Sequence, residues 1–156
     1  MKIFKVWSIA VVLLMAMVAC EKPNNGGPNN GDNGPVLTGI DGEWKLVSVN
    51  GVEPEFTVYL FFESGLFNMY QQIYTLDYLY YEGDYTIKGD TLSGVYIEGD
   101  KWKCDYKGSV SEDGNTLTLV SKESNPITCV YEACEIPLDV IQEALATRSM
   151  EAVPFL

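Results

Sequence analysis

The residue types that carry most enzyme chemistry are scarce in this sequence. Histidine, the commonest general base and metal ligand, is absent. The cysteines after position 100 lack the Cys-x-x-Cys spacing that is typical of zinc and redox sites. The acidic residues lie mostly in predicted turns, where a solvated carboxylate is the default, whereas glycoside cleavage needs a matched pair of carboxyl groups. We therefore expect no enzyme activity, no cofactor and no metal site.

Tyrosine, a residue type that often contributes to binding sites, is concentrated in one stretch, between positions 69 and 85. The residues are Tyr70, Tyr74, Tyr78, Tyr80, Tyr81 and Tyr85. Aromatic faces with hydroxyl tips suit the binding of sugars, peptides or protein partners. Strand propensity and core packing account for the same residues without any ligand. The spacings of four, four and three residues between Tyr70, Tyr74, Tyr78 and Tyr81 also fit one face of a helix, which would make part of the cluster a lid over the barrel mouth.

The N-terminal residues predict export and anchoring. Residues 1–19 combine a basic start, a short apolar run and a small residue before Cys20, which predicts a secretory signal peptide. Residues 17–20, Met-Val-Ala-Cys, resemble a bacterial lipobox, and this implies cleavage before Cys20 and lipidation of that residue. A plain signal peptide with an incidental cysteine is the alternative. Residues 20–35 then form a lipidated cysteine and a flexible Gly/Asn/Pro tether, because they offer no large apolar side chain to bury.

The charge balance narrows the classes of partner. Without Lys2 and Lys5 of the signal peptide, eight basic residues face 22 acidic ones, a net charge of −14. A nucleic-acid-binding protein needs a basic face that releases counterions, so we expect no nucleic-acid partner. The N-terminal lipid makes a membrane the first expected partner. The predicted lipid anchor indicates a cell-envelope, outer-membrane lipoprotein, and the sequence does not decide between the periplasmic and the surface face of that membrane.

Residues 36–156 predict one all-β domain. Short runs rich in Val, Ile, Thr and aromatic residues are separated by turn residues. The eight predicted strands are 43–49, 56–62, 66–73, 83–88, 91–97, 101–110, 116–122 and 127–134. Strands at this spacing favour a closed eight-stranded antiparallel barrel, since closure removes exposed edges. A helix at about 137–147, with an apolar stripe at Leu138, Ile141 and Leu145, is expected to pack outside.

Alternation with a period of two assigns the faces of the strands. It is clearest in the sixth strand, where lysines at 101, 103 and 107 oppose Trp102, Cys104 and Tyr106. The predicted inward positions are Trp44, Leu46, Leu60, Phe62, Phe67, Met69, Tyr85, Ile87, Leu92, Tyr96, Trp102, Cys104, Tyr106, Gly108, Leu117, Leu119, Ile127, Cys129 and Tyr131. A barrel of eight strands is just wide enough to be filled by side chains or to hold one small ligand.

Three cysteines follow Cys20, and export permits a disulfide. An odd number leaves at least one thiol free or paired outside the chain. Cys104 and Cys129 share the inward parity, whereas Cys134 has the parity opposite to that of Cys129. Cys104 and Cys129 are therefore the pair expected to bridge, if any pair does. The alternative is that all three are small buried apolar side chains.

The motifs together resemble lipocalin-like (calycin) domain lipoproteins of Gram-negative gut bacteria. Gly42-Glu43-Trp44 is similar to the Gly-x-Trp that begins the first lipocalin strand, where the Trp closes the barrel floor. Residues 83–94 (GDYTIKGDTLSG) and Val130-Tyr131-Glu132, which leads into Ile136-Pro137, are also similar. The lipocalin pattern has an Arg late in the barrel, packed across the Trp. The eighth strand here has none, and Arg148 lies beyond the helix.

The resemblance implies a binding function for a small hydrophobic or amphipathic ligand. The candidate ligand-binding residues are Trp44, Leu60, Phe62, Phe67, Tyr74, Tyr78, Tyr81, Tyr85, Tyr96, Trp102, Tyr106 and Tyr131. The alternative is a barrel that docks on a protein partner, as lysozyme- or protease-inhibitor-like barrels do, or an accessory lipoprotein of the outer membrane. A cavity of roughly 300 Å³ or more, open at one end, favours the first function. A filled barrel with an exposed aromatic patch favours the second.

Overall fold

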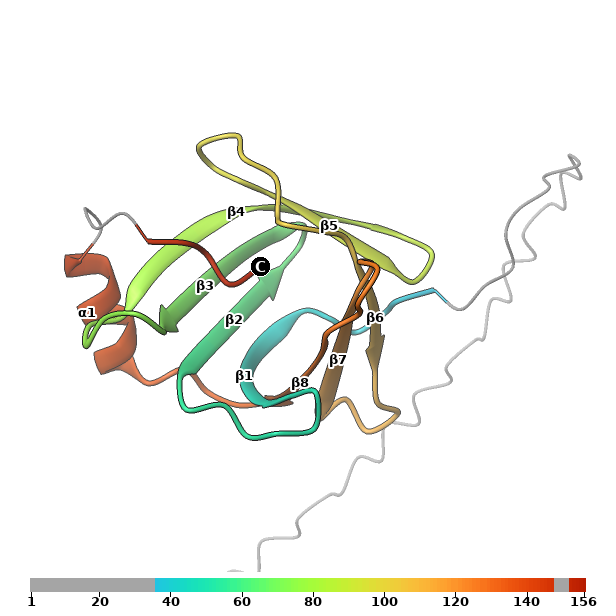
Figure 1. The fold of residues 1–156 in the computed structure, drawn as a ribbon, viewed down its shortest axis with the longest axis horizontal. Coiled ribbons are helices and arrows are strands. Elements are labelled where there is room, and N and C mark those ends of the chain that lie inside the picture. Colours follow the sequence, from blue (N-terminus) through green and yellow to red (C-terminus); the bar gives the residue numbers. More distant parts are fainter. Residues whose placement is uncertain (1–35, 148–151) are drawn as a thin grey trace, which may run out of the picture. The chain divides into compact units, whose positions relative to one another are not determined.

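The structure, a computed structural model, describes residues 36–147 and 152–156. In this part of the chain, eight antiparallel strands pair in sequence order, and β8 pairs with β1 to close a barrel (Figure 1). The strands are β1 (Gly42–Val49), β2 (Thr57–Glu63), β3 (Leu66–Gln72), β4 (Leu79–Lys88), β5 (Thr91–Tyr96), β6 (Tyr106–Val110), β7 (Thr116–Ser121) and β8 (Thr128–Ala133). The predicted fold class is confirmed. The predicted signal peptide, Cys20 and tether lie outside the described residues.

Six strands lie within one residue of their predicted bounds at each end, and two strands, β4 and β6, differ by more. β4 begins at Leu79 and so includes Tyr80 and Tyr81, while Tyr70 lies in β3. The helical lid considered for this tyrosine cluster is therefore wrong, because pairing with β3 outweighs the helical spacing. β6 begins at Tyr106 and not at residue 101, because the chain turns after β5 and Lys101 makes only an isolated bridge to Val95 before the chain bends again. The β5–β6 ladder has two residue pairs, Thr91 with Lys107 and Leu92 with Tyr106.

Trp102 fills the gap that this short ladder leaves. Its backbone N–H donates to the Gly94 carbonyl at 3.0 Å, and its indole lies directly over Gly94. A Cβ atom at position 94 would come within 2.1 Å of the indole ring. The ring also makes an edge contact with Phe67, 5.0 Å between centroids. Glycine in β5 is thus required by the close approach of a large side chain.

The two ends of the barrel differ. Because neighbouring strands are antiparallel, the β2–β3, β4–β5 and β6–β7 turns lie at one end with the start of β1, and we call this end the floor. Residues 36–41 cross the floor, and Leu37 and Ile40 are buried there. The Trp44 indole N–H donates to the Ile40 carbonyl at 2.8 Å. Gly42 has φ +141°, which residues with a side chain rarely adopt. Gly42 and Trp44, the two defined residues of the Gly-x-Trp motif, therefore both help to shape the floor.

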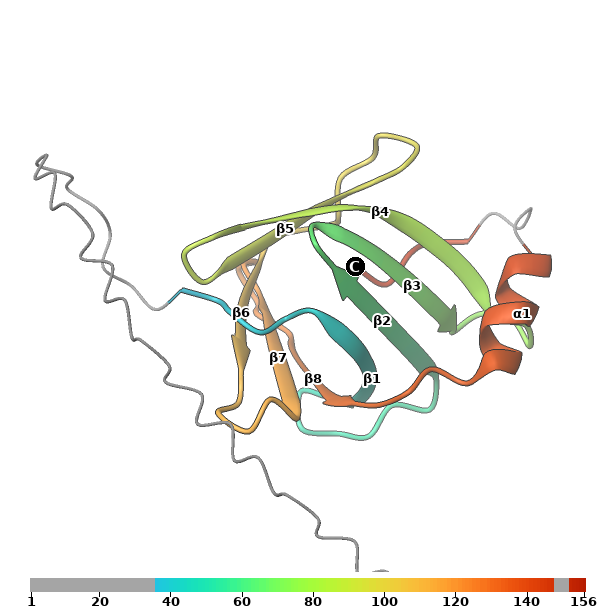
Figure 2. The ribbon, with the colours of Figure 1, turned by 180° about the vertical axis from the view of Figure 1, so that it is seen from behind.

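Helix α1 (Leu138–Ala146) packs outside the barrel against β3 and β4, as predicted (Figures 1 and 2). Its buried residues are Val140 and Ala144, which meet Tyr59 and Tyr70 on the outer face of the sheet. The predicted stripe is wrong in part, because Leu138 and Leu145 are exposed. The helix is rotated so that an i, i+4 pair of smaller side chains faces the sheet, which allows close approach.

The contact between Gly94 and Trp102 gives the first prediction. Gly94→Ala is expected to destabilise the barrel by about 1–3 kcal/mol, because the added methyl group overlaps the indole and one of the two must move. Urea unfolding followed by circular dichroism measures the loss. Ser93→Ala, at the neighbouring position on the other face of β5, is the control and is expected to leave the free energy of unfolding within about 0.5 kcal/mol of the wild-type value. An unchanged midpoint for Gly94→Ala would show that Trp102 does not pack on β5.

Candidate functional site at the mouth of the barrel

The end of the barrel opposite the floor, which we call the mouth, holds an internal occupant. Here β1–β2, β3–β4, β5–β6 and β7–β8 are connected, and residues 152–156, which we call the tail, lie between the strand ends. Figure 1 shows the tail running from the side of α1 into the barrel. Leu156 is 2% exposed and belongs to the main core cluster, where Phe155 packs partly buried.

Gln71 is the polar residue at the centre of the mouth. It is the last inward-facing residue of β3 after Phe67 and Met69, and its side chain is 0% exposed. Its amide donates from Nε2 to the Val153 carbonyl at 2.9 Å and accepts at Oε1 from the Phe155 N–H at 2.8 Å. Both hydrogen-bonding groups of this buried amide are therefore satisfied by the backbone of the tail.

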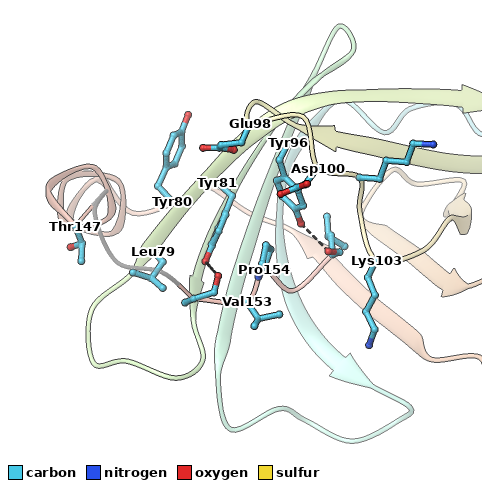
Figure 3. A pocket seen from close by; sticks show the side chains of 13 residues that line it. Leu79, Tyr80, Tyr81, Tyr96, Glu98, Asp100, Lys103, Thr147, Val153 and Pro154 are labelled. Atoms are coloured by element: carbon cyan, nitrogen blue, oxygen red, sulfur yellow. Dashed lines mark hydrogen bonds between the residues drawn. The ribbon is translucent and has the colours of Figure 1, made fainter.

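Two tyrosine hydroxyls hold the tail on either side of Gln71. Tyr81 in β4 donates to the Ala152 carbonyl at 2.9 Å, and Tyr96 at the end of β5 donates to the main-chain oxygen of Leu156 at 2.8 Å. Figure 3 shows both side chains reaching the tail, while Tyr80 on the same strand points the other way. Burial raises the pKa of both hydroxyls above the usual value of 10, so they remain protonated donors.

Two cavities flank the tail. The larger, about 560 Å³, is lined by Leu79, Tyr81 and Tyr96 on the strands and by the acidic Glu98 and Asp100 on the β5–β6 connection (Figure 3). The smaller, about 310 Å³, has a mainly apolar lining that includes Val49, Phe56, Ile73, Tyr106 and Ile127. Lys103, Val153 and Pro154 line both cavities. The tail thus divides one mouth into two compartments.

The floor half of the barrel is filled by side chains. Phe62 meets Tyr85 edge to face at 5.1 Å, and Phe67 meets Tyr96 at 5.6 Å between ring centroids. Filling with aromatic rings leaves two buried polar atoms, the Trp102 Nε1 and the Tyr131 hydroxyl, without hydrogen-bond partners among the described residues. Within the barrel that residues 36–147 and 152–156 form, space for a ligand is therefore confined to the mouth.

The predicted ligand-binding residues separate into four groups. Tyr81, Tyr96 and Tyr106 line the mouth cavities. Those packed in the core without lining either cavity are Trp44, Leu60, Phe62, Phe67, Tyr85, Trp102 and Tyr131. Tyr74 is 73% exposed at the rim, although it touches the smaller cavity. Tyr78 lies outside the barrel, where it packs on Tyr59, because its backbone N–H is held by Glu143 of α1.

Gln71 and the tail are the parts of the site that the sequence analysis missed. The period of two that places Phe67 and Met69 inward places Gln71 inward as well, and a polar residue at an inward position is a signal. The tail gives no such signal, since residues 152–156 have neither strand alternation nor helical period. Only the folded barrel shows that an apolar pentapeptide finds buried donors there.

The three cysteines of the described residues are free thiols. Cys104, Cys129 and Cys134 form no disulfide in the described structure, so the predicted Cys104–Cys129 bridge is not formed. Cys129 is buried, and its burial, with Cys104 nearby, raises the pKa of its thiol to about 11. Cys129 packs in the core cluster, with Cys104 partly buried against it, and both behave as small apolar side chains.

Within 36–147 and 152–156, no three His, Cys, Asp or Glu side chains are grouped so that they could hold a metal ion. In this part of the chain, no helix has the length and apolar character needed to cross a membrane.

Comparison with known proteins gives two likenesses among solved structures. The first is a crystal structure of a lipocalin-like protein from Bacteroides uniformis ATCC 8492, with 19% identity and a TM-score of 0.47. The match covers 62% of this chain and 99% of that one. The second is the REP1-NXSQ fatty acid transporter, with 11% identity, a TM-score of 0.39, and coverage of 63% and 98%. No family model and no curated protein matches the chain.

The buried tyrosines give a pH prediction. Burial, together with the hydrogen bond that its hydroxyl donates to Asp41 at 2.7 Å, raises the pKa of Tyr85 to about 12. Between pH 10 and 12 the unfolded chain loses a proton that the folded chain retains, so the free energy of unfolding falls as pH rises. Urea unfolding at pH 8, 10 and 11 is expected to show a smaller fall for Tyr85→Phe than for the wild type. The exposed Tyr74→Phe is the control, and equal falls in all three proteins would contradict the buried hydroxyl.

Proposed function

We propose that this protein is a membrane-anchored, lipocalin-like binding protein for a small hydrophobic or amphipathic ligand, and that the ligand binds in the mouth. The observation that carries the proposal is the cavity of about 560 Å³ beside the tail, which lies in the size range of small-molecule sites. Its wall combines the apolar Leu79 with the aromatic rings of Tyr81 and Tyr96. Apolar walls with a few fixed polar groups are the usual composition of such sites.

The filled floor limits the ligand. Phe62, Phe67 and Trp44 occupy the depth of the barrel, so a long chain cannot extend to the floor as it would in an open calyx. A ligand that fits here is short and keeps one end at the open rim. The rim carries Lys101 and Lys103 as well as Glu98 and Asp100, which offer both signs of charge to a polar end group.

A second candidate function is docking of the rim on a protein partner. Two loops at the mouth expose large apolar side chains: Val52 on the β1–β2 loop, and Tyr74 and Leu76 on the β3–β4 loop. Exposed apolar side chains gathered at one end of a molecule are a feature of interaction surfaces. The cavity favours the small-molecule function, and this apolar rim favours the second.

Ligand binding is tested with a fluorescent apolar probe such as N-phenyl-1-naphthylamine. The probe is expected to bind with 1:1 stoichiometry and a blue-shifted emission. Lys103→Trp, at the wall shared by both cavities, is expected to weaken binding about tenfold by filling space. Lys88→Trp, an exposed position at the floor end of β4, is the matched control. No saturable binding, or equal loss in both variants, would count against a site in the mouth.

Membrane anchoring rests on Cys20 and is tested separately. Produced in a bacterial host that processes lipoproteins, the wild-type protein is expected in the membrane fraction with the mass of an acylated chain that begins at Cys20. Cys20→Ser is expected to shift the protein to the soluble fraction and to lose the added mass. Intact-mass spectrometry of both fractions gives the readout, and a soluble wild-type protein without acyl mass would refute the anchor.

A further inference from the structure

We propose that the mouth recognises the backbone of an extended apolar peptide segment, and that the tail is the resident occupant that such a peptide displaces. The inference uses the site of the proposed function and names the class of its ligand. It rests on four hydrogen bonds from three side chains, Gln71, Tyr81 and Tyr96, all of which end on backbone atoms of the tail.

The Gln71 amide binds the tail as a neighbouring strand would. In an extended chain, the C=O of residue i−1 and the N–H of residue i+1 point to the same side, and here these are the Val153 carbonyl and the Phe155 N–H. Pro154 lies between them, so its missing N–H faces away from Gln71 and nothing is lost. The pattern is a one-residue strand addition, made by a side chain inside the barrel and not by a sheet edge.

The chemistry of the buried groups selects the occupant. A buried amide left without partners costs free energy, and Gln71 needs both an acceptor and a donor. A hydrocarbon chain supplies neither, and an ionised carboxylate supplies acceptors alone. A peptide backbone supplies both at the required separation, and two further main-chain oxygens accept hydrogen bonds from the hydroxyls of Tyr81 and Tyr96.

The side chains of the tail indicate which peptides fit. Leu156 is buried among core residues, and Phe155 packs against Phe56 with 5.8 Å between ring centroids. Val153 is 69% exposed and leaves room for other side chains at that position. Backbone hydrogen bonds carry the recognition, while two apolar side chains at positions equivalent to 155 and 156 set the preference.

Exchange of the tail is geometrically open. The cavities of about 560 and 310 Å³ lie on either side of the tail, and Val153 and Pro154 are walls of both. An incoming peptide therefore has space beside the tail before the tail leaves. The tail competes as a tethered ligand, so removing it is expected to strengthen the binding of a free peptide.

The test uses isothermal titration calorimetry with the synthetic peptide acetyl-Ala-Val-Pro-Phe-Leu. In the full chain, Leu156→Asp puts a charge at a buried position and is expected to expel the tail. The peptide is expected to bind this variant at least tenfold more tightly than the wild type. Adding Gln71→Leu to Leu156→Asp is expected to weaken peptide binding about tenfold or more. Gln72→Leu, the next residue on β3, where the side chain bonds to Leu76, is the matched control and is expected to change nothing.

A modified peptide tests the hydrogen bond to Gln71 directly. Replacing the amide N–H of the Phe residue by an ester oxygen removes the donor of the hydrogen bond that Gln71 Oε1 accepts. The ester peptide is expected to bind Leu156→Asp about tenfold more weakly than the amide peptide does, and to bind the Gln71→Leu double variant with no further loss. Equal affinities of the two peptides for Leu156→Asp would overturn backbone recognition by Gln71.

The outcomes separate this inference from the proposed function. If Leu156→Asp binds the apolar probe but not the peptide, the peptide inference is overturned and the proposed function stands. If it binds neither, both fail. If Leu156→Asp does not fold, as judged by circular dichroism, a chain that ends at Glu151 replaces it. Hydrogen exchange of wild-type Phe155 gives an independent check: its N–H is expected to be protected and to lose protection when the peptide is added in excess, and an unprotected N–H would overturn the resident occupant.

Discussion

The two hydrogen bonds between the Gln71 amide and the tail are the interaction on which the mouth of the barrel depends. In a closed barrel the backbone donors and acceptors of the strands point along the sheet and are used in the ladders, so the interior offers a buried side chain few partners. Gln71 cannot be reached by water, since its side chain is fully buried. The tail supplies what the barrel wall cannot, and the same two bonds fix the course of the tail and the shapes of both cavities.

The asymmetry of the barrel follows from how each end is closed. At the floor, residues 36–41 supply apolar side chains and one acceptor, the Ile40 carbonyl, for the Trp44 indole, so that end is filled mainly by apolar and aromatic side chains. At the mouth, the groups that face inward include an amide and two hydroxyls, which need an occupant with a regular series of polar atoms. One end is therefore a packed core, and the other is a site.

Most of the wall was predictable from the sequence, because turn residues mark the strand ends and alternation marks the faces. Trp102, Tyr106 and Gly108 point inward as the alternation indicates, although residues 101–105 are not strand. Residues 101–105 are not strand because the Trp102 indole packs over Gly94, and local propensity cannot show such a contact. The Tyr78 side chain escaped prediction for a similar reason, since a helix distant in sequence holds its backbone.

The site was less predictable than the wall. Its polar centre, Gln71, has a clear parity signal, but the occupant is a segment without periodicity whose placement depends on groups from β3, β4 and β5 at once. Contacts between segments so far apart in sequence depend on the complete fold. A sequence pattern can indicate that a buried glutamine needs a partner, but it cannot identify that partner.

A tethered occupant also sets the range of ligands that the mouth can serve. Because the tail belongs to the same chain as the barrel, its effective concentration near its own site is about 1 mM. If the free pentapeptide bound the empty mouth with a Kd of about 10 μM, the tail would lower the apparent affinity of any competitor about 100-fold. A ligand that merely fills apolar space would have to overcome that factor and also leave the Gln71 amide unpaired. A ligand with its own peptide backbone has to overcome only the competition with the tail, because it can pair with the Gln71 amide. The occupied mouth therefore favours peptides over purely apolar ligands.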